Sequence, residues 1–376
     1  MAEPQRLDFP ESKIMKCACL FQGNGQAWIF VHVLKGDKSR LEFRRLEGRK
    51  WSEVGVVAEL GDRTALEVEL APGLADSTEP MLLWSVSSNS AQDKKIKMSR
   101  WLGEIWSPPE DTPGVMSQGG RCGLVALNSR RSQLLAMFTG NLEPPEEYSV
   151  GGHGWSPVKP FYMNFSGTTW SKASAMAPRS RWTFLDLAVV GGPGVREVVA
   201  RTQYGGPIWI HPSRLECGTV TEDGNWIDRS RIGDGEGSIY HPTGARDSEG
   251  VLHVAYDLYI QDKGIFTRYR TKKGNEWSDP RNLGGVGING CVGGDSKGNI
   301  YLYWTKRGGA ETHYMDCGYI KVISGQRESL PMDVAPIHDA RFYQTPGPRV
   351  YLVGTPNPKT VSIQQIMVPD DSNGLR

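Results

Sequence analysis

A short pattern recurs five times along this chain: a Gly, then one or two residues, then Trp, often followed by Ser. The copies read GRKWSEV (48–54), GEIWSPP (103–109), GTTWSKA (167–173), GNWIDRS (224–230) and GNEWSDP (274–280). Their Trp residues, at positions 51, 106, 170, 226 and 277, are separated by 55, 64, 56 and 51 residues. Repeats of about 40–60 residues built from short strands are typical of propeller blades rather than of solenoid coils. The repeat therefore favours a ring of similar β-sheets.

Strand patterns fall between these copies in the same order each time. Strongly apolar stretches, expected to be second strands, lie at 27–33, 81–86, 134–138, 197–202, 251–256, 300–304 and 349–353. Alternating stretches, expected to be third strands, lie at 41–45, 95–100, 161–165, 208–211, 264–270, 313–317 and 361–367. Alternation of polar and apolar residues indicates half-buried strands. Seven such pairs predict an all-β, seven-bladed β-propeller, with a six-bladed ring as the alternative.

We expect one domain over residues 1–376, because no linker, low-complexity tract or block of like charge divides the chain. The predicted blade units are 14–57, 65–110, 119–175, 182–230, 236–281, 287–332 and 335–370. In the sixth unit, 325–332 stands where the Trp pattern is expected. The seventh unit has no fourth strand of its own. We predict that residues 5–9 supply that strand and close the ring, which removes exposed sheet edges.

The repeated Gly and Trp residues are interpreted as structural. A Gly permits the tight turn that precedes each Trp. The Trp offers a large apolar face that can pack between neighbouring blades. These residues are expected to hold the ring together and to take no part in chemistry.

Charge argues against a nucleic-acid partner. Lys plus Arg number 43 and Asp plus Glu number 42, so the net charge is +1, whereas nucleic-acid binders carry a clustered basic excess. No apolar run approaches the roughly 18 residues of a membrane helix, so no membrane partner is expected. The first residues lack the order of a secretory signal, which predicts a cytoplasmic protein, although a mature secreted form behind a new Met would read the same. We also expect a monomer.

No metal or cofactor is expected either. The six Cys, at 17, 19, 122, 217, 291 and 317, show no zinc-ligand spacing and are predicted to be buried free thiols. The sequence holds no nucleophile elbow, phosphate loop or dinucleotide fingerprint. Function must therefore depend on side chains gathered by the fold.

The Trp-containing units resemble the Asp-box, or bacterial neuraminidase repeat, of sialidase-like propellers. Thr271-Lys-Lys-Gly274-Asn-Glu-Trp277 and Phe165-Ser-Gly167-Thr-Thr-Trp170 have its Gly and Trp but not its Asp. The stretch 248–257, SEGVLHVAYD, is similar to a second strand common in these propellers. The resemblance implies a glycan-acting propeller, with polysaccharide lyases as relatives. The arginine triad of sialidases cannot be placed, and the early Asp-His-Asn-like signature of the lyases is replaced by ALEVEL (65–70).

In a propeller, residues at the starts of the innermost strands and on the loops joining second to third strands line the central funnel. The strand starts offer Glu67, Arg121, Arg181, Trp182, Tyr240, His241, Asn289, His338, Asp339 and Arg341, and the loops offer Tyr204, Tyr259 and Lys306. We predict that the catalytic residues are His241, Tyr240, Arg121 and His338. We predict that the substrate-binding residues are Glu67, Arg181, Trp182, Tyr204, Asn289 and Arg341.

His241 is the leading candidate because imidazole suits acid–base catalysis near neutral pH. Tyr240 beside it can donate a proton or a hydrogen bond, and Arg121 or Arg181 can clamp a carboxylate. Adjacent strand residues point to opposite faces, so Tyr240 and His241 can face the funnel together only at a β-bulge.

These residues suit an enzyme that acts on a glycan or another small polar molecule, including lyase chemistry next to a uronate. Two alternatives stay open. One is a cofactor-free natural-product cyclase of secondary metabolism, similar to the fungal hetero-Diels–Alderases. The other is a carbohydrate-binding lectin without catalysis. In each case the expected partner is a small molecule or an oligosaccharide.

Overall fold

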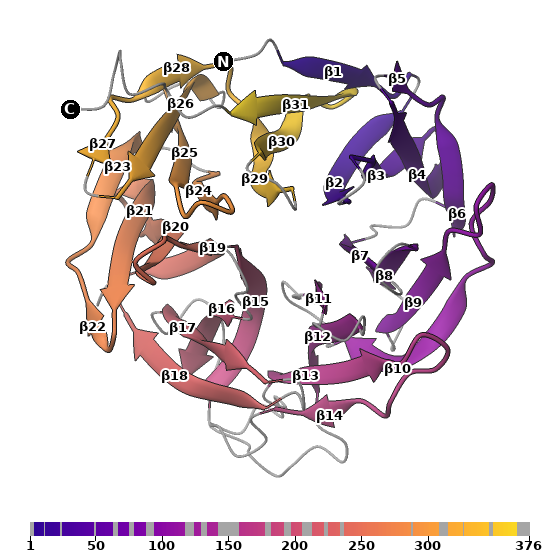
Figure 1. Cartoon of the computed structure of the whole chain (residues 1–376), viewed down its shortest axis with the longest axis horizontal. Helices are drawn as coiled ribbons and strands as arrows, with labels where there is room; N and C mark the ends of the chain where they lie inside the picture. Colours follow the sequence, from indigo (N-terminus) through magenta and orange to yellow (C-terminus); the bar gives the residue numbers. More distant parts are fainter. Residues whose placement is uncertain are drawn as a thin grey trace.

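The computed structural model consists of strands arranged in a ring (Figure 1). It describes residues 4–10, 12–22, 25–48, 50–62, 67–74, 79–87, 94–116, 124–128, 134–141, 158–176, 182–191, 197–204, 213–221, 225–233, 237–286, 289–307, 315–325, 327–345 and 349–366. These residues form 31 strands and no helix. It follows that no helix among them is long and apolar enough to cross a membrane.

Each antiparallel array runs from an innermost strand outward. The first holds β2 (Lys13–Phe21), β3 (Ala27–Lys35), β4 (Lys38–Glu47) and β5 (Lys50–Trp51), and β6 (Gly55–Asp62) also pairs with β4. The second holds β7 (Glu67–Leu74), β8 (Pro80–Ser87), β9 (Lys94–Arg100) and β10 (Glu110–Met116). The third holds β11 (Leu124–Asn128), β12 (Leu134–Asn141), β13 (Val158–Phe165) and β14 (Ser174–Ala175).

The next two arrays are joined. One holds β15 (Trp182–Gly191), β16 (Glu197–Tyr204), β17 (Ser213–Val220) and β18 (Trp226–Ile232). The other holds β19 (Ser238–Arg246), β20 (Leu252–Ile260), β21 (Gly264–Lys273) and β22 (Glu276–Trp277), with β23 (Arg281–Val286) also on β21. A short parallel pairing of β15 with β19, through Val190↔Gly244 and Gly191↔Ala245, makes one continuous sheet of the two.

The remaining strands complete the ring. One array holds β24 (Cys291–Gly294), β25 (Ile300–Arg307), β26 (Met315–Ser324) and β27 (Arg327–Glu328), with β28 (Met332–Val334) on β26. The last holds β29 (His338–Gln344), β30 (Val350–Asn357), β31 (Thr360–Ile366) and β1 (Gln5–Asp8). The N-terminal strand β1 pairs with β31 in the register Gln5↔Ile363, as expected for ring closure by the start of the chain.

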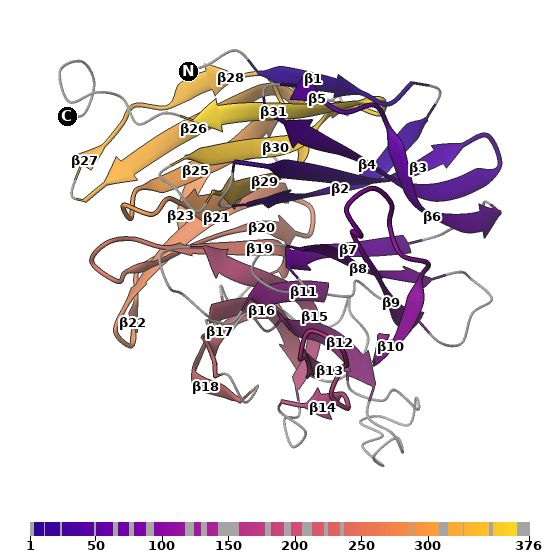
Figure 2. The same cartoon turned by 45° about the vertical axis from the view of Figure 1, so that its right-hand side comes forward.

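The innermost strands face the centre of the ring (Figure 1). In chain order they are β2, β7, β11, β15, β19, β24 and β29, and each contacts the next one, with β2 contacting β29. Both views place the β29–β30–β31–β1 array beside the first array (Figures 1 and 2). The predicted all-β propeller is confirmed.

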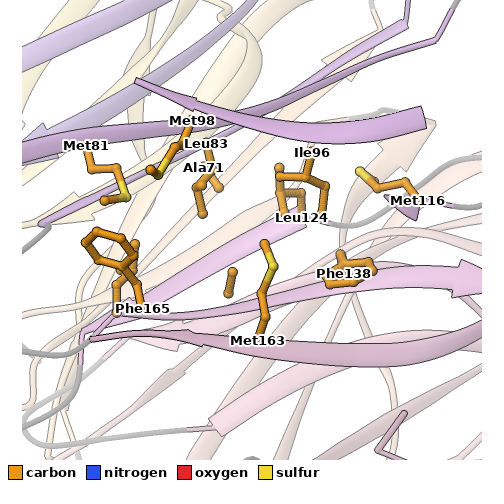
Figure 3. Packing of buried hydrophobic residues seen from close by; sticks show 12 residues of the cluster. Ala71, Met81, Leu83, Ile96, Met98, Met116, Leu124, Phe138, Met163 and Phe165 are labelled. Atoms are coloured by element: carbon orange, nitrogen blue, oxygen red, sulfur yellow. The ribbon is translucent and has the colours of Figure 1, made fainter. Parts of the chain in front are cut away.

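The hydrophobic core is divided among the junctions between neighbouring arrays. At one junction, Ile96 and Met98 of β9 face Met163 of β13 (Figure 3). The same arrangement recurs around the ring, so the second strands are buried on both faces, as in β3, where Ile29, Phe30 and Val31 are fully buried. This explains why the second strands read as apolar runs rather than as alternating ones.

Third strands were predicted less accurately. The stretch 208–211 lies outside the described residues, and the third strand of that array is β17, which begins at Ser213.

The prediction of buried free thiols also needs a correction. All five described cysteines are free, but Cys17 is only half-buried and Cys317 is exposed, while Cys122 lies outside the described residues.

The Trp side chains of the repeated Gly–Trp pattern contact the preceding array. The indole N–H of Trp277 donates to Ser230 Oγ at 2.9 Å, and that of Trp51 donates to Gln5 Oε1 at 2.9 Å. Trp106 packs edge-on against Trp28 of the first array. In the β26–β27 hairpin, Glu328 takes the place of Trp and pairs across the junction with Arg281 at 3.4 Å. These contacts support the structural interpretation of the repeat.

The Ser that follows the box position makes the same two hydrogen bonds wherever it occurs. Its hydroxyl accepts from the N–H seven residues earlier, at 2.9–3.1 Å, and donates to the carbonyl of the next residue. The members are Ser52, Ser107, Ser171, Ser278 and Ser329. The hydroxyl thus fixes the turn against the third strand, including in the hairpin that has lost its Trp.

We expect Ser107→Ala to lower the free energy of unfolding by about 1 kcal/mol, because Ser107 is buried and Arg100 N–H would lose its hydroxyl acceptor. Ser171→Ala is the matched control, since Ser171 is exposed and water can replace its hydroxyl. Urea unfolding of both variants measures the difference. Equal losses in the two variants would contradict this account.

Candidate functional site

A β-bulge in β19 places Tyr240 and His241 beside each other. Tyr240 pairs with Asp257 and Thr243 pairs with Ala255, so two residues of β19 lie opposite one residue of β20. His241 has φ +49°, which is unusual for a residue with a side chain. The rings of Tyr240 and His241 are 6.3 Å apart between centroids. The bulge interrupts the alternation that would otherwise separate the two side chains.

His241 bonds to a buried carboxylate. Its Nδ1 lies 3.3 Å from Asp257 Oδ2, and its side chain is 35% exposed whereas that of Asp257 is 1% exposed. The Asp257 carboxylate also accepts from Thr267 Oγ1 (3.0 Å), Asn289 N (3.0 Å) and Gly290 N (3.2 Å). A carboxylate on Nδ1 favours the tautomer in which Nδ1 carries the proton, which leaves Nε2 as the basic nitrogen.

The close approach at Gly290 explains how this loop reaches Asp257. A Cβ at Gly290 would lie 2.0 Å from Thr267 Cγ2, a contact that no other residue could make without displacement. Asn289, with φ +67°, presents its N–H to the carboxylate and is itself buried. Asp257 therefore ties β19, β20, β21 and the start of β24 together at one point.

A buried arginine supports Tyr240. Arg201 of β16 is 2% exposed, and its guanidinium carbon lies 4.3 Å from the centroid of the Tyr240 ring. Its Nη1 is 3.7 Å from Asp186 Oδ2, which is on β15. A cation over an aromatic face, removed from water, stabilises by about 2 kcal/mol. Arg201 thus fixes the Tyr240 ring from the neighbouring array.

Two further innermost strands, β2 and β7, bring charged groups close to Asp186 of β15. Lys16 of β2 donates to Glu69 of β7 at 2.5 Å. Burial raises the pKa of the Glu69 carboxyl, Lys16 opposes this shift, Asp186 adds to it and Arg341 opposes it. These four side chains, from four different innermost strands, are therefore close enough to interact electrostatically.

The innermost strand β29 has a bulge like that of β19. His338 pairs with Thr355 and Arg341 pairs with Val353, and Asp339 between them has φ +50°. His338 and Asp339 are exposed, while Arg341 is half-buried. Nearby, burial raises the pKa of the Cys17 thiol to about 12; Asp339 adds to the shift, and Arg341 opposes it. Cys17 is therefore protonated at neutral pH, and Asp339 and Arg341 lie close to β2.

The structure brings some predicted residues together and leaves others apart. Tyr240, His241 and Asn289 meet around Asp257, and His338 and Arg341 lie on β29. Trp182 packs within its own array, with the Arg231 guanidinium 4.0 Å from its ring, so its predicted ligand-stacking face is in contact with protein. Tyr259 and Lys306 are exposed.

Other predicted residues cannot be placed. Arg121 and Arg181 lie outside the described residues, and the side chains of Glu67 and Tyr204 are not described either. Among the side chains that are described, no group of three or more His, Cys, Asp or Glu residues could hold a metal ion. The roles assigned to these residues stay predictions.

Sequence reasoning missed several residues of the site: Asp257, Arg201, Asp186, Lys16 and Glu69. Asp257 and Arg201 are charged residues inside apolar second strands, β20 and β16, and this anomaly is a signal that could have found them. Lys16, Glu69 and Asp186 follow the starts of their strands by two to four residues, so their meeting depends on the curvature of the ring.

Neither a family model nor a curated protein matches this chain. Among solved structures, it is similar to an ulvan lyase of a polysaccharide lyase family, with a TM-score of 0.62, 10% identity and 96% of each chain covered. A second structure of that lyase contains a glucuronate–rhamnose 3-sulfate ligand. A protein of unknown function from Dyadobacter fermentans gives a TM-score of 0.51 at 10% identity, covering 86% of this chain and 99% of its own. At such identity the likeness shows the fold alone, a β-propeller.

Proposed function

We propose that this protein is a glycan-acting enzyme, specifically a lyase that cleaves a polysaccharide next to a uronate, with His241 as the base. The observation that carries this proposal is the bond between the half-exposed His241 and the buried Asp257, set beside Tyr240 at a strained bulge. Strained residues persist where the surrounding structure constrains them, and they gather at functional sites. The similarity of the fold to a polysaccharide lyase adds support.

Lyase chemistry needs a base and an acid on one substrate. The basic Nε2 of His241 takes the proton from the carbon next to the uronate carboxyl group, C5. The electron pair of that C–H bond forms a C4=C5 double bond, and the C4–O glycosidic bond breaks. The leaving oxygen takes the proton of the Tyr240 hydroxyl. Exchange with water then returns both side chains to their starting states.

The site also needs a cation for the substrate carboxylate, because proton abstraction at C5 places negative charge on that group. Arg121 and Arg181 are the predicted partners for it. Arg201 serves a different purpose, since it is buried against the ring of Tyr240. We assign it to holding the acid in place.

The experiment is to incubate the protein with uronate-containing polysaccharides and to follow the ultraviolet absorbance of the unsaturated product. We expect absorbance to rise together with new reducing ends, in equal amounts. Binding without any unsaturated product would favour the lectin alternative. Thermal stabilisation by terpenoid or polyketide intermediates alone would favour the cyclase alternative.

A further inference from the structure

One face of a single array carries three arginines. The strands that hold them, β17 and β18, are the two outermost strands of that array (Figure 1). Glu216 of β17 is directly opposite Arg231 of β18, so their side chains share a face. Arg214 and Arg229 lie two residues away from them along each strand, and alternate strand residues point to the same face. Three guanidinium groups therefore surround the carboxylate of Glu216.

That carboxylate is shared by two of the arginines. The Glu216 side chain is 2% exposed, and it accepts from Nε of Arg231 at 2.7 Å and also from Nε of Arg229. The third arginine, Arg214, is exposed, and its guanidinium forms no hydrogen bond or ion pair with any described residue. Asp228, at the bulge before Arg229, is exposed and forms no ion pair with the three described arginines. Three cations thus meet one buried anion, which leaves an excess of two positive charges on this face.

Aromatic rings hold the guanidinium groups in place. The guanidinium carbons of Arg231 and Arg214 lie 4.0 and 5.1 Å from the centroid of the Trp182 ring. The guanidinium carbon of Arg229 lies 5.1 Å from the centroid of the Trp226 ring. A cation that stacks on an aromatic face is stabilised there, so the three groups are positioned before any ligand arrives.

The arginines also keep donors directed away from Glu216. Arg229 and Arg231 each turn Nε and Nη2 toward that carboxylate. Nη1 of each forms no hydrogen bond with a described residue, and neither does the guanidinium of Arg214. A guanidinium donates to oxyanions in a fixed, fork-like geometry. The face therefore offers donors from three side chains to one oxyanion.

The like charges lie within electrostatic reach of one another. Burial lowers the pKa of the Arg231 guanidinium, Glu216 opposes this shift, and the charges of Arg229 and Arg214 add to it. Like charges held close together disfavour each other's charged form, and a bound anion relieves this repulsion.

The size of the excess selects among oxyanions. A carboxylate or a sulfate ester carries one negative charge, whereas a phosphate monoester carries roughly −1.5 to −2 at pH 7 and has three strong acceptor oxygens. An excess of two positive charges is matched by the phosphate monoester and not by the singly charged groups.

We propose that Arg214, Arg229 and Arg231 form a binding site for the phosphate group of a small phosphomonoester. The site lies on the outer strands β17 and β18, whereas His241 lies on the innermost strand β19. It is therefore a second site, and it does not depend on the proposed lyase activity.

The test is calorimetric titration of the whole protein with glucose 6-phosphate and with glucose 6-sulfate, a probe of similar shape with less charge. We expect one phosphate probe to bind per chain, with a Kd about ten-fold or more below that of the sulfate. Arg214→Gln should raise the Kd for glucose 6-phosphate about ten-fold or more, the effect of losing a charge-assisted hydrogen bond. Thermal unfolding should not change, because the Arg214 side chain is exposed and outside any described ion pair.

Arg281→Gln is the matched control. Arg281 is also an exposed arginine beside an aromatic ring, 6.0 Å from the Tyr269 centroid, but it pairs with Glu328 at 3.4 Å. The Kd of this variant should equal that of the original protein. An unchanged Kd in Arg214→Gln, an equal rise in Arg281→Gln, or equal Kd values for the two probes would overturn the phosphate site. Binding of inorganic phosphate that Arg214→Gln weakens would support it and show that the phosphate group alone is sufficient.

Discussion

His241→Gln is expected to lower kcat on a uronate polysaccharide by about 10²–10⁴-fold, the usual contribution of a positioned base. Glutamine can keep a hydrogen bond to Asp257 but has no basic nitrogen to take the C5 proton. His241 is partly exposed and contributes one of several bonds to Asp257, so the variant should remain folded. Initial rates of product absorbance, with thermal unfolding measured in parallel, give both quantities.

His253→Gln is the matched control for that experiment. His253 lies on β20 in the same array, with its Nε2 3.1 Å from Asp247 Oδ2 and its Nδ1 2.5 Å from the Tyr269 hydroxyl. It is 4% exposed and pairs with Ala245, in the regular part of the ladder beyond the bulge. We expect this variant to lose stability while keeping kcat per folded molecule. A His241→Gln enzyme with full kcat would remove His241 from the mechanism.

The architecture could be predicted because short sequence patterns, the repeated Trp and the apolar second strands, recur in each array. The repeated Trp packs on the preceding array, and the second strands are buried on both faces. The first requirement gives a Trp at regular spacing, and the second gives a continuous apolar run. The closing strand β1 could be predicted because the last array lacked a fourth strand. The predicted third strand at 208–211 lies outside the described residues, and the described third strand of that array begins at Ser213.

The site could be predicted only in part. Tyr240, His241 and Asn289 were predicted because they are polar residues near strand starts. Asp257, to which His241 and Asn289 bond, directly follows the stretch 251–256 that was predicted as an apolar second strand. Its place depends on the bulge in β19, and a bulge is set by tertiary contacts rather than by alternation. The contact of Arg201 with Tyr240 likewise joins strands of two arrays.

Asp257→Ala is expected to give the largest loss of stability near the site, about 3 kcal/mol in the free energy of unfolding. The substitution would leave the N–H groups of Asn289 and Gly290 and the hydroxyl of Thr267 without their acceptor in a buried place. Buried donors left unsatisfied cost about 1–3 kcal/mol each, partly recovered by rearrangement. Activity per folded molecule should also fall, because His241 would lose the group that sets its tautomer and orientation.

Asp295→Ala separates these two effects. Asp295 is equally buried and accepts from Lys297 N, Asn299 N, Asn299 Nδ2 and Tyr301 Oη at 2.7–2.9 Å, but all four donors belong to the hairpin between β24 and β25. A comparable loss of stability with unchanged kcat is expected for this variant. If Asp257→Ala also kept its kcat once corrected for the folded fraction, Asp257 would be a structural carboxylate like Asp295. If only Asp257→Ala lost kcat, the same carboxylate that ties the strands together would also orient the base, and the strain at His241 would have its explanation in the chemistry.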